Sequence, residues 1–300
     1  MLVAVNAAPA NAARGAGVGR RCCGLEKSWM AITEYADHDG LEGGLRKRPR
    51  RPDYGFDGNM IGLVAMGVVV AALVAAAALK RAGHVGIAAV AAIVAVYLVA
   101  MIGFYLHTTR QGKFDVWSEI LDALRLRGDE RVLDAGCGRG AVLTMVGKHL
   151  PRGSAIGVDI WSKRDQSGNC LEATERNLAA EGVHKHCKAV TGDMRAMPFP
   201  DASFDLAVSS LAIHNIFGRA GRRQAVAEIA RVLKPGGRVA IADVACTRTH
   251  KQQLEQLGFV DVKGRGLGWR FWWGPGFPTT TLVIGTKPRS DAGSPTPTVP

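Results

Sequence analysis

The chain has 300 residues, of which 47% are hydrophobic, and its formal net charge is +12. This composition provides a sizeable core for one large or two small domains, and the charge makes a nucleic acid or an anionic membrane surface a partner to consider. The six cysteines form no C-x-x-C pair and no metal-ligand spacing, which excludes a cysteine-based metal site and predicts free thiols in a reducing compartment. We expect no bound metal.

Residues 1–58 are rich in Ala, Gly and Arg and show no sustained hydrophobic period, so we expect a disordered basic segment. The first 25 residues contain Arg but no acidic residue, which is typical of a transit peptide. Translation from Met30 is the alternative interpretation, and the sequence does not decide between the two. The basic run RKRPRR at 46–51 could contact a nucleic acid, but the residues that follow favour another role.

Two apolar runs follow this basic segment. Met60–Leu79 contains no charged residue, and Ala82–Leu106 contains only His84 as a group that could carry charge. Each run is long enough to cross a bilayer, and only a short turn with Lys80 and Arg81 separates them. We therefore predict a two-helix transmembrane hairpin over residues 59–107. A pair of buried helices in a soluble domain is the alternative.

The charges that flank the hairpin predict its orientation. Several basic residues precede the first run and Arg110 and Lys113 follow the second, whereas the connecting turn holds only two. By the positive-inside rule both flanks are cytoplasmic, so we predict a multi-pass membrane protein with a cytoplasmic domain and membrane lipid as a partner. The basic run at 46–51 is then a topology signal beside anionic headgroups, and no nucleic acid is expected.

Strands and helices alternate over residues 108–288, which predicts an α/β domain with a mostly parallel sheet and helices on both faces. Apolar residues at helical spacing from Val116 to Leu124 predict a first helix. The predicted strands lie near 131–135, 155–159, 187–191, 205–210, 237–243, 258–264 and 280–286, and further helices near 139–150, 169–181 and 220–233. The Ser-, Pro- and Thr-rich residues 289–300 are expected to be a disordered tail.

The most informative stretch is RVLDAGCGRG at 131–140. An apolar strand ends in Asp134, and three glycines follow at alternate positions, namely Gly136, Gly138 and Gly140. Glycine allows a tight turn with positive φ and lets a ligand lie against the backbone, and the helix that follows presents free N–H groups. The D-x-G-x-G-x-G spacing differs from the G-x-G-x-x-G pattern of dinucleotide enzymes.

Three further stretches follow at regular intervals. Asp159 ends a predicted strand about twenty residues past the glycine loop, where a carboxylate can bind a ribose diol. Asp193 and Met194 follow the next strand, and RVLKPGGRVAIADV at 231–244 predicts a helix, a turn and a strand.

Together these four stretches resemble, over about residues 113–287, the class I S-adenosylmethionine-dependent methyltransferases, and most nearly their ubiquinone and menaquinone C-methyltransferase branch. The resemblance implies a Rossmann-like seven-stranded sheet, S-adenosyl-L-methionine as cofactor, Asp159 as the ribose ligand, and adenine contacts from Asp193 and Met194. The cofactor-binding residues that we predict are Asp134, Gly136, Cys137, Gly138, Gly140, Asp159, Ile160, Trp161, Asp193, Met194 and Ser209. The hairpin departs from that branch, so the resemblance does not transfer a substrate.

The acceptor side is predicted at the end of the strand near 205–210, which borders the ligand crevice of such a sheet. His214 is the candidate base and Asn215, with Ser210, could orient an acceptor; a structural histidine is the alternative. In the polar loop 161–169, Trp161 could flank the adenine while Asp165, Gln166 and Asn169 close the site. The aromatic stretch Trp269–Phe277 could contact an apolar acceptor, touch the bilayer or simply pack in the fold.

The function predicted from these residues is methyl transfer from S-adenosylmethionine to a small or lipophilic acceptor at the cytoplasmic membrane face. A membrane scaffold that retains the fold without activity is an alternative. An RNA methyltransferase is less favoured, because Ser209-Ser210-Leu211-Ala212 stands where an N-P-P-Y-type tetrapeptide would be expected. A nicotinamide oxidoreductase is disfavoured by the glycine spacing. The sequence makes no prediction of oligomeric state.

Overall fold

The computed structural model of this chain describes residues 51–57 and 61–289. The expectations for 1–50, 58–60 and 290–300, including the tail and most of the basic segment, lie outside the described residues. Residues 51–57 fall within the segment that we expected to be disordered. They instead make defined contacts with the α/β domain, as described below.

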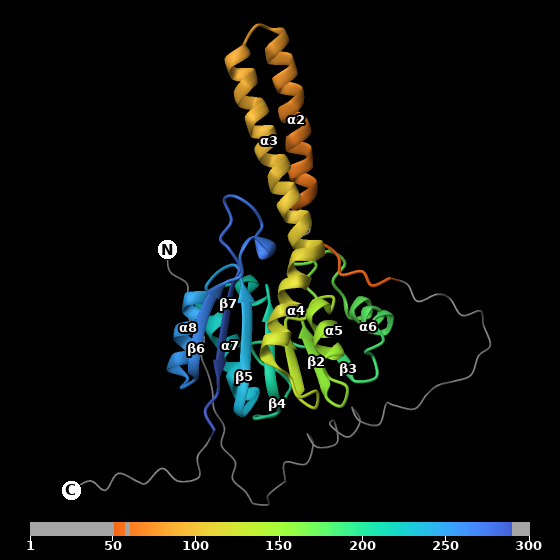
Figure 1. The fold of residues 1–300 in the computed structure, drawn as a ribbon, viewed down its shortest axis with the longest axis vertical. Helices are drawn as coiled ribbons and strands as arrows, with labels where there is room; N and C mark the ends of the chain where they lie inside the picture. The colour runs from red at the N-terminus through yellow and green to blue at the C-terminus, as the bar shows by residue number, and fades with distance from the viewer. Residues whose placement is uncertain (1–50, 58–60, 290–300) are drawn as a thin grey trace, which may run out of the picture. The chain divides into compact units, whose positions relative to one another are not determined.

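The core of the described chain is a seven-stranded sheet with the order β3-β2-β1-β4-β5-β7-β6 (Figure 1). The strands from β3 to β5 pair in parallel, and β7 pairs antiparallel with β5 and β6. Their bounds are β1 Arg131–Ala135, β2 Ser154–Asp159, β3 Cys187–Thr191, β4 Phe204–Ser210, β5 Leu233–Asp243, β6 Val260–Gly266 and β7 Thr281–Thr286. The predicted seven-stranded, mostly parallel sheet is confirmed.

Helix α4 (Lys113–Leu124) precedes β1, and the helices that connect strands are α5 Ala141–Lys148, α6 Leu171–Ala180, α7 Arg219–Val232 and α8 Thr247–Gln256. Because the strand order reverses direction at β1, right-handed crossovers place α5 and α6 on one face and α7 and α8 on the other. The sequence prediction missed α8. Its buried side consists of His250, Gln253 and Leu254. Because two of these three residues are polar, the sequence lacks the regularly spaced apolar residues that indicate a helix.

The predicted turn at Pro235-Gly236-Gly237 takes a different form, because β5 already begins at Leu233. The partner of Phe204 in β4 is Leu233, whereas the partner of Leu206 is Arg238. The additional residues form a bulge in which Gly236 adopts φ +79. The glycine is therefore needed for an irregularity within the strand rather than for a separate turn.

Two apolar helices precede the domain, α2 (Ile61–Arg81) and α3 (Val85–His107), and they lie side by side (Figure 1). α3 continues through a π-helical turn, η1 (Thr108–Gly112), into α4 without a break. In the part of the chain that the structure describes, one helix, Val85–Leu124, is long and apolar enough to cross a membrane. The two predicted helices are thus present, and their crossing of a membrane stays a prediction.

The aromatic stretch that precedes β7 packs against the end of α3. Trp272 contacts Phe104 with ring centroids 5.1 Å apart, and Trp273 contacts Tyr105 at 5.8 Å. The Thr108 hydroxyl donates a hydrogen bond to the Trp272 carbonyl. This stretch therefore packs against α3, as expected if it serves packing in the fold. Trp269 differs from its neighbours in the stretch, since it is 62% exposed.

Candidate functional site

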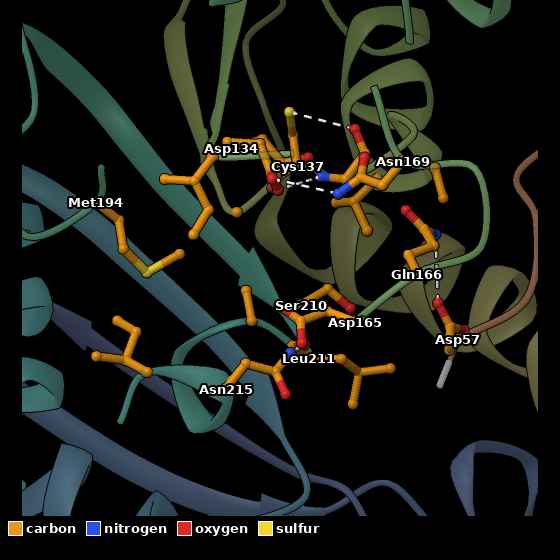
Figure 2. A pocket seen from close by; sticks show the side chains of 18 of the residues that line it. Asp57, Asp134, Cys137, Asp165, Gln166, Asn169, Met194, Ser210, Leu211 and Asn215 are labelled. Carbon is orange, nitrogen blue, oxygen red and sulfur yellow. Dashed lines mark hydrogen bonds between the residues drawn. The ribbon is translucent and has the colours of Figure 1, made fainter. Parts of the chain in front are cut away.

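A cavity of about 310 Å³ lies at the carboxyl ends of β1, β2, β3 and β4 (Figure 2). This is the edge of the sheet at which a doubly wound fold binds its ligands, next to the reversal of strand order. One wall comes from the loops that follow these strands. Another part of the lining comes from α4 and from Asp57, both outside the glycine-loop region.

The glycine loop after β1 has the backbone that its sequence predicts. Gly136, Gly138 and Gly140 have φ values of +77, +50 and +80, which residues with a side chain rarely adopt. A Cβ atom on Gly136 would collide with Ala212 and Met194, and one on Gly138 would collide with the Gln166 side chain. The three positions therefore require glycine, and the loop lies open to the pocket at Gly136 and Gly138.

Asp134 ends β1 and lies 1% exposed at the base of this pocket. Within the described residues, neither of its carboxylate oxygens has a hydrogen-bond partner of normal geometry. Burial, together with the nearby Asp159 charge, raises the pKa of Asp134 to about 8. A buried carboxylate without a partner is costly, so this position fits a cationic ligand group that would satisfy it.

Cys137 lies beside Asp134 in the loop (Figure 2). Burial, and then the two neighbouring aspartates, raise the pKa of its thiol well above the ordinary value. A thiol that stays protonated is a poor nucleophile. The residue therefore serves packing around the loop.

Asp159 ends β2 and holds the glycine loop in place. Its Oδ2 accepts a hydrogen bond of 2.8 Å from the Gly138 N–H, and its Oδ1 accepts one of 2.7 Å from the Trp161 N–H. The Asn169 side chain donates a third at 3.3 Å. Burial raises the pKa of Asp159 although these hydrogen bonds oppose the shift. Since a carboxylate has about four acceptor sites, this arrangement leaves room for one ribose hydroxyl.

The end of β3 contributes Asp193 and Met194 to the pocket. The Asp193 carboxylate is paired with Arg195, at 2.9 Å from Nε and 2.5 Å from Nη2. This guanidinium lowers the pKa of Asp193. Met194 lies at the opposite end of the pocket from Asp57 (Figure 2).

At the end of β4 two adjacent serines have different roles. The Ser209 hydroxyl is buried and donates a hydrogen bond of 2.8 Å to the Ala135 carbonyl, so it bridges β4 to β1. The Ser210 hydroxyl faces the pocket and accepts a hydrogen bond of 2.8 Å from Trp117 Nε1. Leu211 follows with φ +54, a strained conformation for a residue with a side chain.

His214 and Asn215 form the short 3-10 helix η2 (Ile213–Asn215) after this strand. Asn215 lines the pocket, whereas the His214 ring pairs with the buried Asp243, with Nδ1 2.5 Å from Oδ1. Burial alone would lower the pKa of His214, but the Asp243 carboxylate outweighs it and raises that pKa. The ring is thus committed to Asp243 and does not line the pocket.

The structure brings together most of the residues that the sequence singled out. The predicted residues that line the pocket are Asp134, Gly136, Cys137, Gly138, Asp159, Ile160, Asp193, Met194 and Asn215, with Ser210, Asp165, Gln166 and Asn169 from the acceptor side and the polar loop. Those that do not line it are Gly140, Trp161, Ser209 and His214. The Trp161 indole instead donates a hydrogen bond to Thr191 Oγ1 at 2.7 Å. The assigned roles stay predictions.

Sequence reasoning missed the wall that lies outside the glycine-loop region. Asp57, Lys113, Phe114 and Trp117 line the pocket, and the Lys113 ammonium lies 2.7 Å from Asp57 Oδ2. Asp57 belongs to a segment that we expected to be disordered, and Lys113 was used only to predict the orientation of the hairpin. The helical spacing from Val116 to Leu124 predicted α4 but could not show that its first turn faces a ligand.

Comparison with known proteins agrees with this geometry. Residues 132–237 match the family model described as "Methyltransferase domain". A ubiquinone/menaquinone biosynthesis C-methyltransferase, UbiE, of Dinoroseobacter shibae is 31% identical over 133 residues, which cover 44% of this chain and 50% of that protein. The sterol 4-C-methyltransferase strm-1 of Caenorhabditis elegans is 31% identical over 137 residues, which cover 46% of this chain and 38% of that protein.

The matched region spans half or less of the length of the curated relatives. Among solved structures, the [4+2]-cyclase SpnF superposes with a TM-score of 0.52 at 15% identity, over 61% of this chain and 84% of that one. This similarity establishes the fold alone.

Proposed function

We propose that this chain, in which residues 132–237 form a class I S-adenosylmethionine-dependent methyltransferase domain, methylates a small lipophilic acceptor at the cytoplasmic face of a membrane. The single observation that carries the proposal is the origin of the pocket lining outside the glycine-loop region. Lys113, Phe114 and Trp117 in that lining belong to α4, which is continuous with the apolar helix α3.

The continuity of this helix supports a pocket close to the proposed membrane surface. Lys113 lines the pocket and lies six residues after His107, the last residue of α3 (113 − 107 = 6). At about 1.5 Å per residue, six residues span roughly 9 Å, which is comparable to the depth of the headgroup region. An acceptor dissolved in the bilayer would reach such a pocket without crossing bulk water.

The rim of the pocket is apolar where an acceptor would enter. Phe217 lines the pocket and is 98% exposed, which is unusual for a large aromatic side chain. Ile216 and Leu211 also line the pocket. Apolar walls with a few polar groups are typical of sites for small hydrophobic ligands, and the relatives named as quinone and sterol C-methyltransferases support an acceptor of this class.

The residues present fit the cofactor. The glycine loop would let the cofactor approach the backbone closely. Asp134 would accept a hydrogen bond from its ammonium group, and Asp159 would accept one from a ribose hydroxyl. Met194 would lie against the adenine. When bound, S-adenosylmethionine supplies a methyl group on a sulfonium, so the protein's part is binding and orientation. Ser210 and Asn215 provide the polar side chains that would orient an acceptor beside the loop. His214 is held by Asp243 and has no direct part in this scheme.

The test uses the full chain in lipid vesicles with trideuteromethyl-labelled S-adenosylmethionine and a total lipid extract, followed by mass spectrometry of the organic phase. We expect a trideuteromethyl-bearing lipid product with the wild type and none with Gly138→Val, whose side chain would collide with Gln166 and strain the loop at its positive φ. Thermal unfolding of the variant shows whether it is folded. Cofactor binding without a labelled product would favour the scaffold alternative, and label in added RNA would favour the nucleic-acid alternative.

The membrane location needs its own measurement. We expect the full chain to float with vesicles and to resist extraction at alkaline pH. Recovery of the whole chain in the aqueous fraction would contradict this part of the proposal while leaving methyl transfer open to the first test.

A further inference from the structure

Two buried ionisable side chains, one acidic and one basic, line the pocket from different elements. Asp134 lies at the end of β1 and is 1% exposed, and the Lys113 side chain lies in the first turn of α4 and is 7% exposed. Lysine is almost never this buried unless its charge has a purpose or a partner.

The position of the Lys113 ammonium is set by a chain of hydrogen bonds that begins at the glycine loop. The Arg139 N–H donates to Gln166 Oε1 at 2.8 Å, and Gln166 Nε2 donates to Asp57 Oδ1 at 3.3 Å (Figure 2). Asp57 Oδ2 then accepts a hydrogen bond of 2.7 Å from Lys113 Nζ. The lysine is therefore held over the glycine-loop end of the pocket rather than free to swing into solvent.

The ammonium group retains unused donor capacity. A lysine has three N–H donors, and Lys113 Nζ donates to Asp57 alone among the described residues. The other cationic residue that lines the described pocket is Arg195. It is paired with Asp193 at the end of β3, away from the glycine loop. An anionic ligand group beside the glycine loop would therefore meet Lys113, whose ion pair with Asp57 uses one of its three N–H donors.

The strand order decides which part of the cofactor lies there. In the proposed function, the adenine lies near the end of β3 and the ribose near the end of β2. The amino-acid end then falls beside β1 and the glycine loop, since the order is β3-β2-β1-β4. This end carries a carboxylate and an ammonium group on one carbon atom. Asp134 and Lys113 match these two charges in sign and lie at this end of the pocket.

We propose that Lys113 binds the carboxylate of the cofactor's amino-acid end while Asp134 binds its ammonium group; this inference rests on the proposed function. The carboxylate subsite lies outside the matched residues 132–237. It is formed by the helix that continues from α3 and by Asp57, which precedes α2. Cofactor affinity therefore depends on the segment that joins the domain to the proposed membrane hairpin, and a fragment that starts after Asp57 lacks part of the site.

The test measures equilibrium binding to the full chain in detergent micelles, with S-adenosylmethionine and with decarboxylated S-adenosylmethionine, which lacks only the carboxylate. We expect Lys113→Met to weaken binding of S-adenosylmethionine about 10- to 100-fold, because a charge-assisted hydrogen bond is lost. Binding of the decarboxylated compound should change less than about twofold. Asp134→Asn should weaken binding of both compounds alike.

Lys251→Met is the matched control, since this lysine pairs with Glu255 on the exposed side of α8 and lies outside the pocket. It should leave both affinities unchanged. If Lys113→Met does not fold, as judged by thermal unfolding, Lys113→Gln provides the same comparison with a shorter polar side chain.

An equal loss for both compounds in Lys113→Met would overturn the inference, because it would indicate a structural role. Unchanged binding of both would also overturn it. Failure of the wild-type chain to bind either compound would instead refute the cofactor assignment on which the proposed function stands.

Discussion

Trp117 Nε1 donates a hydrogen bond of 2.8 Å to Ser210 Oγ and so joins the first half of α4 to the end of β4 inside the pocket. Trp117 is fully buried, and it lies one helical turn after Lys113 on the same side of the helix. The contact ties the helix that continues from α3 to the strand end at which an acceptor is expected. The helix that continues from α3 and the pocket are thus one packed unit.

Replacing Trp117 with Phe tests this contact. The variant keeps an aromatic ring but loses the donor and part of the buried volume, so we expect the free energy of unfolding to fall by about 1–3 kcal/mol. Thermal or denaturant unfolding of the full chain in detergent measures it. Trp161→Phe is the matched control, because its indole also donates to a hydroxyl, Thr191 Oγ1, but at the exposed rim. A loss no larger than that of the control would contradict the account.

Asp134 predicts a pH dependence of cofactor binding. Its pKa of about 8, raised by burial and by Asp159, means that the empty site is mostly protonated at pH 7. A bound ammonium group favours the ionised carboxylate, so binding releases a proton and affinity should rise by up to about tenfold per pH unit below the pKa. Calorimetry between about pH 6 and 7.5, where an α-ammonium group is mostly charged, tests this in buffers of different ionisation enthalpy.

Asp134→Asn serves as the control for that titration, because it keeps the shape and cannot ionise. Its affinity should be lower and nearly independent of pH over the same range. A wild-type affinity that does not change with pH would refute the proposed role of this carboxylate.

The His214–Asp243 pair predicts a pH dependence of stability. The pKa of His214 is raised from 6.5 in the folded state, since Asp243 outweighs the opposing effect of burial. A raised histidine pKa contributes stability that is complete below pH 6.5 and is lost as pH rises through the folded-state pKa. The wild type should therefore exceed Asp243→Asn in its thermal unfolding midpoint by more at pH 6 than at pH 8.5.

The difference between the two proteins reports on the His214–Asp243 pair, because Asp134 titrates in both proteins and its effect on stability cancels. His184→Gln, at an exposed position, should leave the difference unchanged. A difference that grows as pH rises would contradict the assignment of the ion pair.

The segment Arg51–Asp57, which we call the N-terminal strap, predicts a role for residues before the hairpin. The Asn177 side chain accepts a hydrogen bond from the Asp53 N–H and donates one to the Asp53 carbonyl, each at 2.9 Å. Arg139 forms an ion pair with Asp53 at 2.8 Å. We expect Asn177→Ala to release the strap and to raise amide hydrogen exchange in the loop 161–169, because Phe56 pairs with Ser167 there.

The control for the strap is Asn215→Ala, which removes an amide that makes no hydrogen bond to the strap within the described residues. Its exchange in the loop 161–169 should match that of the wild type. Equal exchange in Asn177→Ala and the wild type would show that the strap does not hold the loop.

How far the sequence could predict this molecule depends on how local each signal is. The glycine loop is local, because φ above zero and close backbone contacts demand glycine at set positions, and so β1, its loop and α5 were predicted. Asp159 followed from strand spacing. By contrast, α8 hides its period behind buried His250 and Gln253. The role of Asp57 depends on Lys113 and Gln166, which lie 56 and 109 residues away in the chain.

His214 illustrates a different limit. Its position after β4 made it a candidate base. Its ring, however, forms an ion pair with Asp243 at the end of β5, and the sequence alone did not predict this pair. Which side chain reaches a pocket is decided by such long-range contacts and not by the motif that contains it.

The most direct test of the central claim is the partition of a tritiated methyl group. The full chain in vesicles that contain a total lipid extract is incubated with S-adenosylmethionine labelled on the methyl group, and the products are separated between organic solvent and water. The account predicts transfer of label to the organic phase, with a loss of transfer in Gly138→Val. Label that appears only in a water-soluble product, or no transfer by a folded chain that binds the cofactor, would contradict it.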